Sequence, residues 1–367
     1  MNRQLDIFSI GCEPIKIKKP IRLIEMFAGY GSQALSLKYL GVKFEHHRIC
    51  EWAIQSIQAY KDLHFTNDNT DYSKDLSIEQ VVDFLLEKGI STDYNKSSPR
   101  KYIERLGNKA RIIYNNIIAT HNLVSVCNVK GADLSIVDTD KYTYLLTYSF
   151  PCQDLSMAGQ RKGMAKDSGT RSGLLWEVER ILSECENKPQ ILLMENVPEV
   201  VGKKNKKHFS EWIKRLDEWG YNSKWQIING TDFGMPQNRK RCFMVSVLGN
   251  YYYTFPNPTG CELRLKDMLE INVDEKYYLS ERALKGCLNS TFDSSRLENR
   301  VAHNGVIPTL CARDYKDPKL VIKPNNDFVA LGTTLGESER FQQPPLVEAS
   351  RCLRTGNGRG GVIEWKK

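Results

Sequence analysis

The stretch IRLIEMFAGYGS, residues 21–32, decides the fold of this chain. Its first six residues are an apolar run that predicts a buried strand, and a helical pattern follows at residues 32–40. Between them, Gly29 and Gly31 would let the backbone turn tightly and approach a ligand closely. The free N–H groups of the next helix would then face that ligand. The stretch therefore predicts a strand, a glycine turn and a helix arranged as in nucleotide-binding sites.

Apolar runs and helical patterns alternate from this stretch as far as about residue 250. Helices are predicted at 52–62, 77–88, 171–186 and 208–219, and further strands at 144–149, 191–194, 224–229 and 242–248. The helix at 77–88 opens with Ser77 and Gln80, which have the spacing of a capping box. This alternation predicts an α/β domain with a largely parallel sheet.

The character of the sequence changes after about residue 250. Aromatic, Pro, Asn and Gly residues become more frequent and regular periodicity fades, which favours a smaller domain of mixed or mainly β structure. We expect an N-terminal extension over residues 1–20, a first domain over 21–248 and a second over 249–367. A basic stretch at about 92–131 is expected to be an insertion in the first domain.

Length and composition exclude several classes of protein. The 367 residues suggest about two domains, and the absence of a run of about eighteen apolar residues argues against a membrane span. The amino terminus lacks the apolar core of a signal peptide, so we expect a cytoplasmic protein. Ten cysteines are scattered without a C-x-x-C pair, so we expect reduced thiols and no metal site. The net charge of +8 permits a polyanionic partner without establishing one.

Acidic residues further along the chain complete the predicted nucleotide site. Glu51 and Trp52 follow a second strand candidate about twenty residues after the glycines, where an acid can accept hydrogen bonds from two ribose hydroxyls. The indole beside it can cover an adenine face. Asp133 offers a third acid at an expected strand end and would accept from an adenine amino group. The same pattern suits the binding of a nicotinamide dinucleotide. Each glycine taken singly also fits a tight structural turn. The type of reaction therefore has to be inferred from other residues.

A reactive cysteine is predicted at the end of the strand at 144–149. Cys152 follows Pro151 there, at the position where open α/β sheets place their ligands, and its thiolate would be the reactive form. Glu195 ends the next strand, and Arg239 and Arg241 would face the same way along an extended segment. Each motif alone also fits a structural cysteine, a cap or a solvated charge cluster. Their order at successive strand ends favours one shared site.

In these residues the sequence resembles the C5-cytosine DNA methyltransferase family. The matching motifs are F-A-G-x-G at 27–31, the acid and Trp at 51–52, F-P-C-Q-D-x-S at 150–156, AGQRKG at 158–163, R-S-x-L-x-x-E at 171–177, E-N-V at 195–197 and Q-x-R-x-R at 237–241. The resemblance covers residues 21 to 248. It implies a Rossmann-like, S-adenosylmethionine-dependent methyltransferase sheet with a smaller target-recognition domain. A dinucleotide oxidoreductase has no need of P-C-Q together with E-N-V.

The resemblance implies a role for each motif. The Cys152 thiolate would add to C6 of a cytosine and make C5 nucleophilic toward a methyl group, while Glu195 would hydrogen-bond or protonate N3. Arg241, with Arg239, would hold the pyrimidine O2. The implied contacts to S-adenosylmethionine are Phe27, Ala28, Gly29, Tyr30, Gly31, Glu51, Trp52, Asp133, Leu134 and Pro151. The implied contacts to the substrate are Gln153, Ser156, Asn196, Val197 and Gln237.

The resemblance also implies the partners of the chain. The family flips its target base out of double-stranded DNA, and the loop at 159–171 is the segment expected to close over it. Basic clusters at 203–207 and 239–241 fit phosphate contacts, although the lysine run equally fits a solvated turn. The expected setting is a restriction–modification system or a phage, the former with a cognate restriction endonuclease as partner. A tRNA methyltransferase stays open as the alternative.

Two family elements are not found near the carboxyl terminus. One is an R-L-Q-type segment that supports the recognition domain, and the other is a final G-N-S/G-V-x-V segment with a helix that returns to the cofactor glycines. Gly356, Asn357 and Gly358 resemble the latter, but only nine residues follow them. We therefore expect a chain shortened at this end, or one completed by a second polypeptide. An inactive remnant that binds DNA and cofactor is a further alternative.

Overall fold

The computed structural model describes residues 13–152, 155, 164–166, 171–264 and 267, and the backbone of four short strands between residues 301 and 331. The chain divides into two compact units. The first comprises Met1–Ile227 and Arg241–Phe255, and the second comprises Ile228–Lys240 and Pro256–Lys367. Residues 228–240, which were expected in the first domain, thus belong to the second unit.

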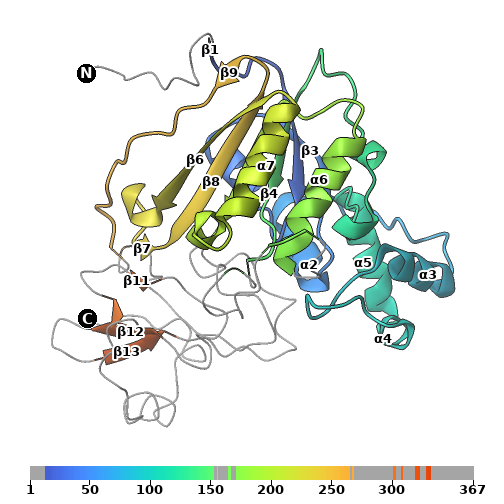
Figure 1. The fold of residues 1–367 in the computed structure, drawn as a ribbon. Helices are drawn as coiled ribbons and strands as arrows, with labels where there is room; N and C mark the ends of the chain where they lie inside the picture. The colour runs from blue at the N-terminus through green and yellow to red at the C-terminus, as the bar shows by residue number, and fades with distance from the viewer. Residues whose placement is uncertain are drawn as a thin grey trace. The chain divides into compact units, whose positions relative to one another are not determined.

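A six-stranded sheet forms the centre of the first unit, with the strand order β3-β2-β4-β5-β8-β6 (Figure 1). Its strands are β2 (Ile21–Met26), β3 (Phe44–Cys50), β4 (Thr143–Tyr148), β5 (Ile191–Asn196), β6 (Tyr221–Asn229) and β8 (Lys240–Leu248). The first four strands in this order are parallel, and β8 is antiparallel to β5. The predicted strands and the largely parallel sheet are confirmed. A further pair joins β1 (Glu13–Pro14) to β9 (Tyr251–Tyr252).

Helices follow the parallel strands, as crossover connections require. They are α1 (Ser32–Tyr39), α2 (Ile54–His64), α6 (Leu175–Glu184) and α7 (Lys206–Glu218). Figure 1 shows α6 and α7 lying across one face of the sheet. Their apolar faces, which include Ile181, Trp212 and Leu216, share the main core with β2, β4, β5 and β8. The predicted helix at 171–186 begins instead with a 3-10 turn, η4 (Arg171–Leu174).

Three more helices pack against α2 around a separate small core. They are α3 (Ile78–Lys88), α4 (Arg100–Arg105) and α5 (Asn108–Ala119). The predicted capping box at the start of α3 is confirmed, because Ser77 Oγ accepts from Gln80 N at 3.1 Å and Ser77 N donates to Gln80 Oε1 at 2.7 Å. The basic stretch at 92–131 supplies α4 and α5 of this group.

The second unit has strands as its main described elements. β7 (Gln237–Asn238) pairs with β11 (Ile307–Pro308), and β10 (Val301–Ala302), β12 (Lys319–Ile322) and β13 (Phe328–Leu331) form a three-stranded sheet. A 3-10 helix, η6 (Gly230–Asp232), precedes β7. No helix within the described ranges of either unit is long and apolar enough to cross a membrane.

Candidate active site

The glycine turn after β2 has a backbone that few residue types adopt. Gly29 and Gly31 have φ values of +58° and +81°, and Phe27 also has a positive φ of +58°. A Cβ added to Gly31 would lie 2.4 Å from His64 Nε2, whereas one added to Gly29 has no described atom within 4 Å. Glycine is therefore required at 31 by packing, while the space beside Gly29 is open to a ligand. Phe27 has a left-handed backbone conformation, which is strained for a residue other than glycine. Such strained residues are frequent at functional sites.

Three residues that the sequence analysis did not predict, His64, Tyr60 and Glu25, hold the glycine turn and the start of α1 in place. His64, at the end of α2, lies with Nε2 2.9 Å from the Tyr30 carbonyl oxygen. The Tyr60 hydroxyl donates to Glu25 Oε2 at 2.6 Å, and Glu25 Oε1 accepts from Ala34 N at 3.2 Å. Burial raises the pKa of Glu25 to about 7. A buried Glu inside an apolar strand was the one signal in the sequence that could have pointed to this network.

Glu51 joins the glycine turn to the carboxyl end of β3. It is buried, and its Oε2 accepts from Gly29 N at 2.9 Å while its Oε1 accepts from Ala53 N at 2.7 Å. These hydrogen bonds fix the orientation of the carboxylate. Burial raises the pKa of Glu51 to about 7, against the opposing effect of the backbone donors. The Glu51 carboxylate is thus fixed at the carboxyl end of β3, where the sequence predicted an acid.

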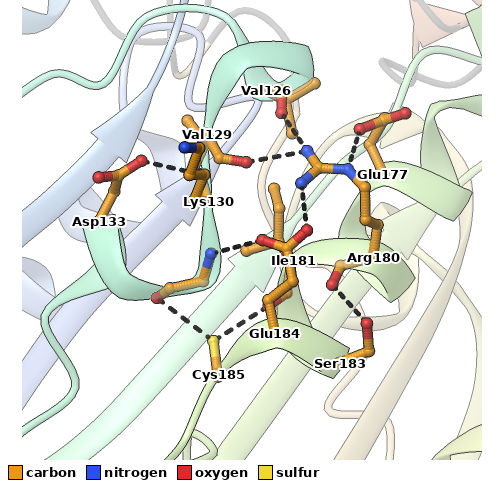
Figure 2. A network of polar contacts seen from close by, with 11 residues as sticks. Val126, Val129, Lys130, Asp133, Glu177, Arg180, Ile181, Ser183, Glu184 and Cys185 are labelled. Carbon is orange, nitrogen blue, oxygen red and sulfur yellow. Dashed lines mark hydrogen bonds and ion pairs between the residues drawn. The ribbon is translucent and has the colours of Figure 1, made fainter.

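The strand end that the sequence predicted at Asp133 is wrong, because the chain forms 3-10 turns there, while the contact of Asp133 to the adenine stays a proposal. Residues Val126–Asn128 and Gly131–Leu134 form two 3-10 helices, η2 and η3, and Asp133 is an exposed residue of η3 whose Oδ2 accepts from Lys130 N at 2.8 Å. Gly131 N donates to Glu184 Oε2 at 2.9 Å at the end of α6 (Figure 2). This contact holds η3 against α6. Leu134 is fully buried in the main core.

A different segment lies beside Glu51. Asn122 Oδ1 accepts from Glu51 N at 3.1 Å, and its Nδ2 donates to the Glu51 carbonyl oxygen at 2.9 Å. Leu123 N also donates to the Ile49 carbonyl oxygen at 2.8 Å. Residues 122–123 therefore lie beside the carboxyl end of β3, and η3 contacts this strand as well, because Arg48 Nε donates to the Asp133 carbonyl oxygen at 3.2 Å. Asn122 carried no sequence signal beyond being a polar residue before an apolar run.

Cys152 stands at the carboxyl end of β4, on a turn that two side chains hold. Asn196 Nδ2 donates to the Phe150 carbonyl oxygen at 3.0 Å, and Ser172 Oγ donates to the Pro151 carbonyl oxygen at 2.8 Å. Cys152 is partly buried against the main core. By contrast, Cys50, Cys185 and Cys242 are buried, and burial raises their pKa values to about 12, 11 and 12. Buried thiols of that kind are unreactive.

Glu195 and Arg241 form an ion pair beside this turn. Glu195 lies on β5, one residue after the Tyr148–Met194 pair that aligns β4 with β5, so it reaches the same sheet edge as Cys152. Arg241 Nε on β8 is 2.9 Å from Glu195 Oε1, with side-chain exposures of 17% and 24%. The expected arrangement of Cys152 and Glu195 at neighbouring strand ends is confirmed. The antiparallel β8 brings the arginine to the glutamate.

The remaining predicted residues are distributed as follows. Ala28 and Val197 are buried, and Tyr30, Trp52 and Pro151 are half-buried. Gln237 and Arg239 belong to the second unit, where Arg239 N donates to the Gln237 carbonyl oxygen at 3.0 Å. Gln153, Ser156, most of the loop at 159–171 and residues 356–358 lie outside the described residues. Within the part of the chain that is described, no group of three or more metal-ligating side chains is present.

Comparisons with known proteins fit this arrangement. Residues 104–315 match the family model of the C-5 cytosine-specific DNA methylase. The chain is 37% identical over 365 residues to the Type II methyltransferase M2.ScrFI of Lactococcus lactis subsp. cremoris, covering 94% of this chain and 96% of that protein. It is 36% identical over 269 residues to the orphan methyltransferase M.SssI of Spiroplasma monobiae, covering 71% and 68%. Among solved structures, the Entamoeba histolytica methyltransferase EhMeth shares the fold, with a TM-score of 0.50, 18% identity and coverage of 85% and 83%.

Proposed function

Because the chain belongs to the family of C-5 cytosine-specific DNA methylases, we propose that it transfers the methyl group of S-adenosylmethionine to C5 of cytosine in double-stranded DNA. The observation that carries this proposal is the shared sheet edge. Cys152 follows β4 there, and the Glu195–Arg241 ion pair lies at the end of the neighbouring β5. A nucleophile and a positioned carboxyl group are the two parts that addition to a pyrimidine ring needs.

Cys152 begins the proposed reaction. Its thiolate sulfur forms a bond to C6, and the electron pair of the C5–C6 double bond moves so that C5 becomes nucleophilic. S-adenosylmethionine, when bound, supplies the electrophilic methyl group that C5 takes up. Loss of the C5 proton to a base then restores the double bond, and the sulfur leaves C6 as a thiolate. Asn196 and Ser172 hold the turn that aims this sulfur.

Glu195 acts on the other side of the ring in this proposal. A carboxyl group at N3 donates or shares a proton and so relieves the charge that builds up during addition. Arg241, whose Nε lies 2.9 Å from Glu195 Oε1, fixes the orientation of Glu195, and its guanidinium group would hold the pyrimidine O2. Arg239 and Gln237, which were predicted beside it, stay proposals for contacts to the base and the neighbouring DNA.

The residues at the glycine turn suit S-adenosylmethionine. The Glu51 carboxylate, which the backbone N–H groups of Gly29 and Ala53 hold in place, would accept hydrogen bonds from the ribose hydroxyls. The open space beside Gly29 admits a ligand close to the backbone. Trp52, Tyr30 and Phe27 are proposed as the apolar surroundings of the adenosine.

The affinity for S-adenosylmethionine should fall as the pH is lowered through 7. The pKa of Glu51 is raised to about 7, so below this pH the carboxyl group carries a proton and loses one acceptor for a ribose hydroxyl. For one such group, linkage predicts a dissociation constant about tenfold higher at pH 6 than at pH 8. Isothermal titration calorimetry would measure it.

Two variants separate this effect from other titrating groups. Glu51→Gln should bind more weakly at every pH and with little pH dependence. Glu25→Gln removes the other buried carboxyl group with a pKa of about 7, and it should keep the pH dependence. A pH dependence that persists in Glu51→Gln and disappears in Glu25→Gln would contradict the assignment.

Transfer of a tritiated methyl group tests the proposed function directly. We expect incorporation into duplex DNA, at cytosine, and none into tRNA. Incorporation into tRNA alone would favour the RNA enzyme, and binding of DNA and cofactor without transfer would favour an inactive remnant. Mapping of 5-methylcytosine in host DNA after expression would then give the target sequence. The Type II names of several relatives support the proposal of a restriction–modification setting.

A further inference from the structure

The loop between α3 and α4 lies against the predicted cofactor site. Ser91 N donates to the Trp52 carbonyl oxygen at 2.7 Å, and Ile54 N donates to the Ser91 carbonyl oxygen at 2.9 Å. These two bonds place the start of the loop beside the segment that follows Glu51. Residues 91–98 belong to the helical group around α2, which the family motifs do not include, so the proposed mechanism assigns them no role.

The loop has a fixed conformation of its own. Asp93 Oδ1 accepts from Asn95 N at 2.9 Å and from Lys96 N at 3.2 Å, and Ser91 Oγ donates to the Lys96 carbonyl oxygen at 2.7 Å. Within this turn Tyr94 has a left-handed backbone, with φ of +60°. That conformation is unfavourable for a tyrosine and persists only where the surroundings impose it.

The hydroxyl of Tyr94 contacts the start of α2, close to the segment that follows Glu51. Its hydroxyl lies 2.8 Å from Ser56 Oγ, in the first turn of α2. Its ring is half-buried, and burial, together with the nearby charge of Glu51, raises the pKa of Tyr94. The phenol is thus held at the first turn of α2, a helix that begins three residues after Glu51.

The loop also contacts Arg171, which is next to the residue that holds the turn before Cys152. Arg171 Nη1 donates to Asn95 Oδ1 at 2.8 Å, although the two residues are 76 positions apart. Arg171 begins η4, and the next residue, Ser172, holds the Pro151 carbonyl oxygen before Cys152. The loop is thus attached through Ser91 beside Glu51 and through Asn95 beside the turn of Cys152. In the sheet order, the carboxyl end of β2, with the glycine turn, lies between those two attachments.

We propose that the loop of residues 91–98 is a wall of the S-adenosylmethionine site, with Tyr94 in contact with the bound cofactor and Asn95 as a positioning residue that holds the wall to Arg171. This assignment rests on the proposed function. An aromatic ring beside the acid that holds the ribose adds apolar contact to the adenosine, and the bond to Arg171 keeps that ring in place.

Cofactor affinity tests the proposal. Tyr94→Ala should raise the dissociation constant for S-adenosylmethionine about tenfold, which is the scale of one lost aromatic contact. Its KM for the cofactor should rise while kcat and the KM for DNA change little. Asn95→Ala should show a smaller rise, and Asn95→Asp, which keeps an acceptor for Arg171, should restore wild-type affinity. Calorimetry with the full chain and steady-state methyl transfer give these values.

Tyr102→Ala is the matched control, because Tyr102 is an exposed tyrosine of α4 in the same helical group. It should bind the cofactor as the wild type does. Tyr94→Phe, which keeps the ring, guards against loss of folding and should fall between the wild type and Tyr94→Ala. If the wild type binds and Tyr94→Ala binds equally well, the wall is refuted and the proposed function stands. If the wild type itself binds no S-adenosylmethionine, the proposed function fails and the wall with it.

Discussion

Cys152→Ser should form no covalent complex with duplex DNA that contains 5-fluorocytosine, and its methyl transfer should fall by roughly 10³-fold or more. The fluorine at C5 cannot leave as a proton does, so a chain that has added its sulfur to C6 stays attached to the DNA. A serine hydroxyl is far less ionised than a thiol at neutral pH and does not add. Denaturing gel electrophoresis separates the attached chain from the free chain.

Cys127→Ser is the control for this experiment. Cys127 is an exposed cysteine on η2, outside the proposed site, and its removal should leave the covalent complex at the wild-type level. Attachment that persists in Cys152→Ser and disappears in Cys127→Ser would place the nucleophile elsewhere. The thiols of Cys50, Cys185 and Cys242 are poor alternatives because their burial raises their pKa values.

Glu195→Gln should lower the rate of methyl transfer by about 10²-fold or more, which is the usual contribution of a positioned acid or base. Glutamine has nearly the same shape and can still accept from Arg241, but it cannot give up a proton to N3. Binding of the DNA should change much less than kcat. Single-turnover transfer of a tritiated methyl group would measure the chemical step.

The ion pair itself gives a second readout. Because Arg241 Nε lies 2.9 Å from Glu195 Oε1, Arg241→Ala should also slow transfer, and the double variant should be less than additive. Glu199→Gln, an exposed acid four positions along the chain, should retain full activity. Additive effects of Glu195→Gln and Arg241→Ala would show that the two side chains act independently.

Local patterns were sufficient for most of the first unit. The strand at 21–26 was predicted with its observed bounds, because an apolar run beside a glycine turn is a property of adjacent residues. The start of α3 at Ser77 was predicted from two residues three positions apart. The motifs around Cys152 and Glu195 are likewise contiguous, so their order alone placed them at neighbouring strand ends.

The local structure at Asp133 could not be predicted from the sequence. An acid at a suitable distance along the chain was taken for a strand end, but the chain there turns into η3 against α6. The contact between Asn122 and Glu51 was likewise not predicted, because the Asn122 side chain binds the backbone of a residue 71 positions away. Spacing in the sequence does not fix such a contact, because it depends on how a helical insertion returns to the sheet.

The sequence by itself therefore determined the alternation of strands and helices, the glycine turn, and the positions of Cys152 and Glu195 at neighbouring strand ends, since each depends on residues that are close along the chain. Only the tertiary structure decided which groups meet across long distances. It placed Arg241 on an antiparallel strand against Glu195, fitted His64 into the space that a side chain at Gly31 would need, and joined Asn95 to Arg171. Those contacts follow from sheet order and packing, which bring together side chains from segments that carry no shared local pattern.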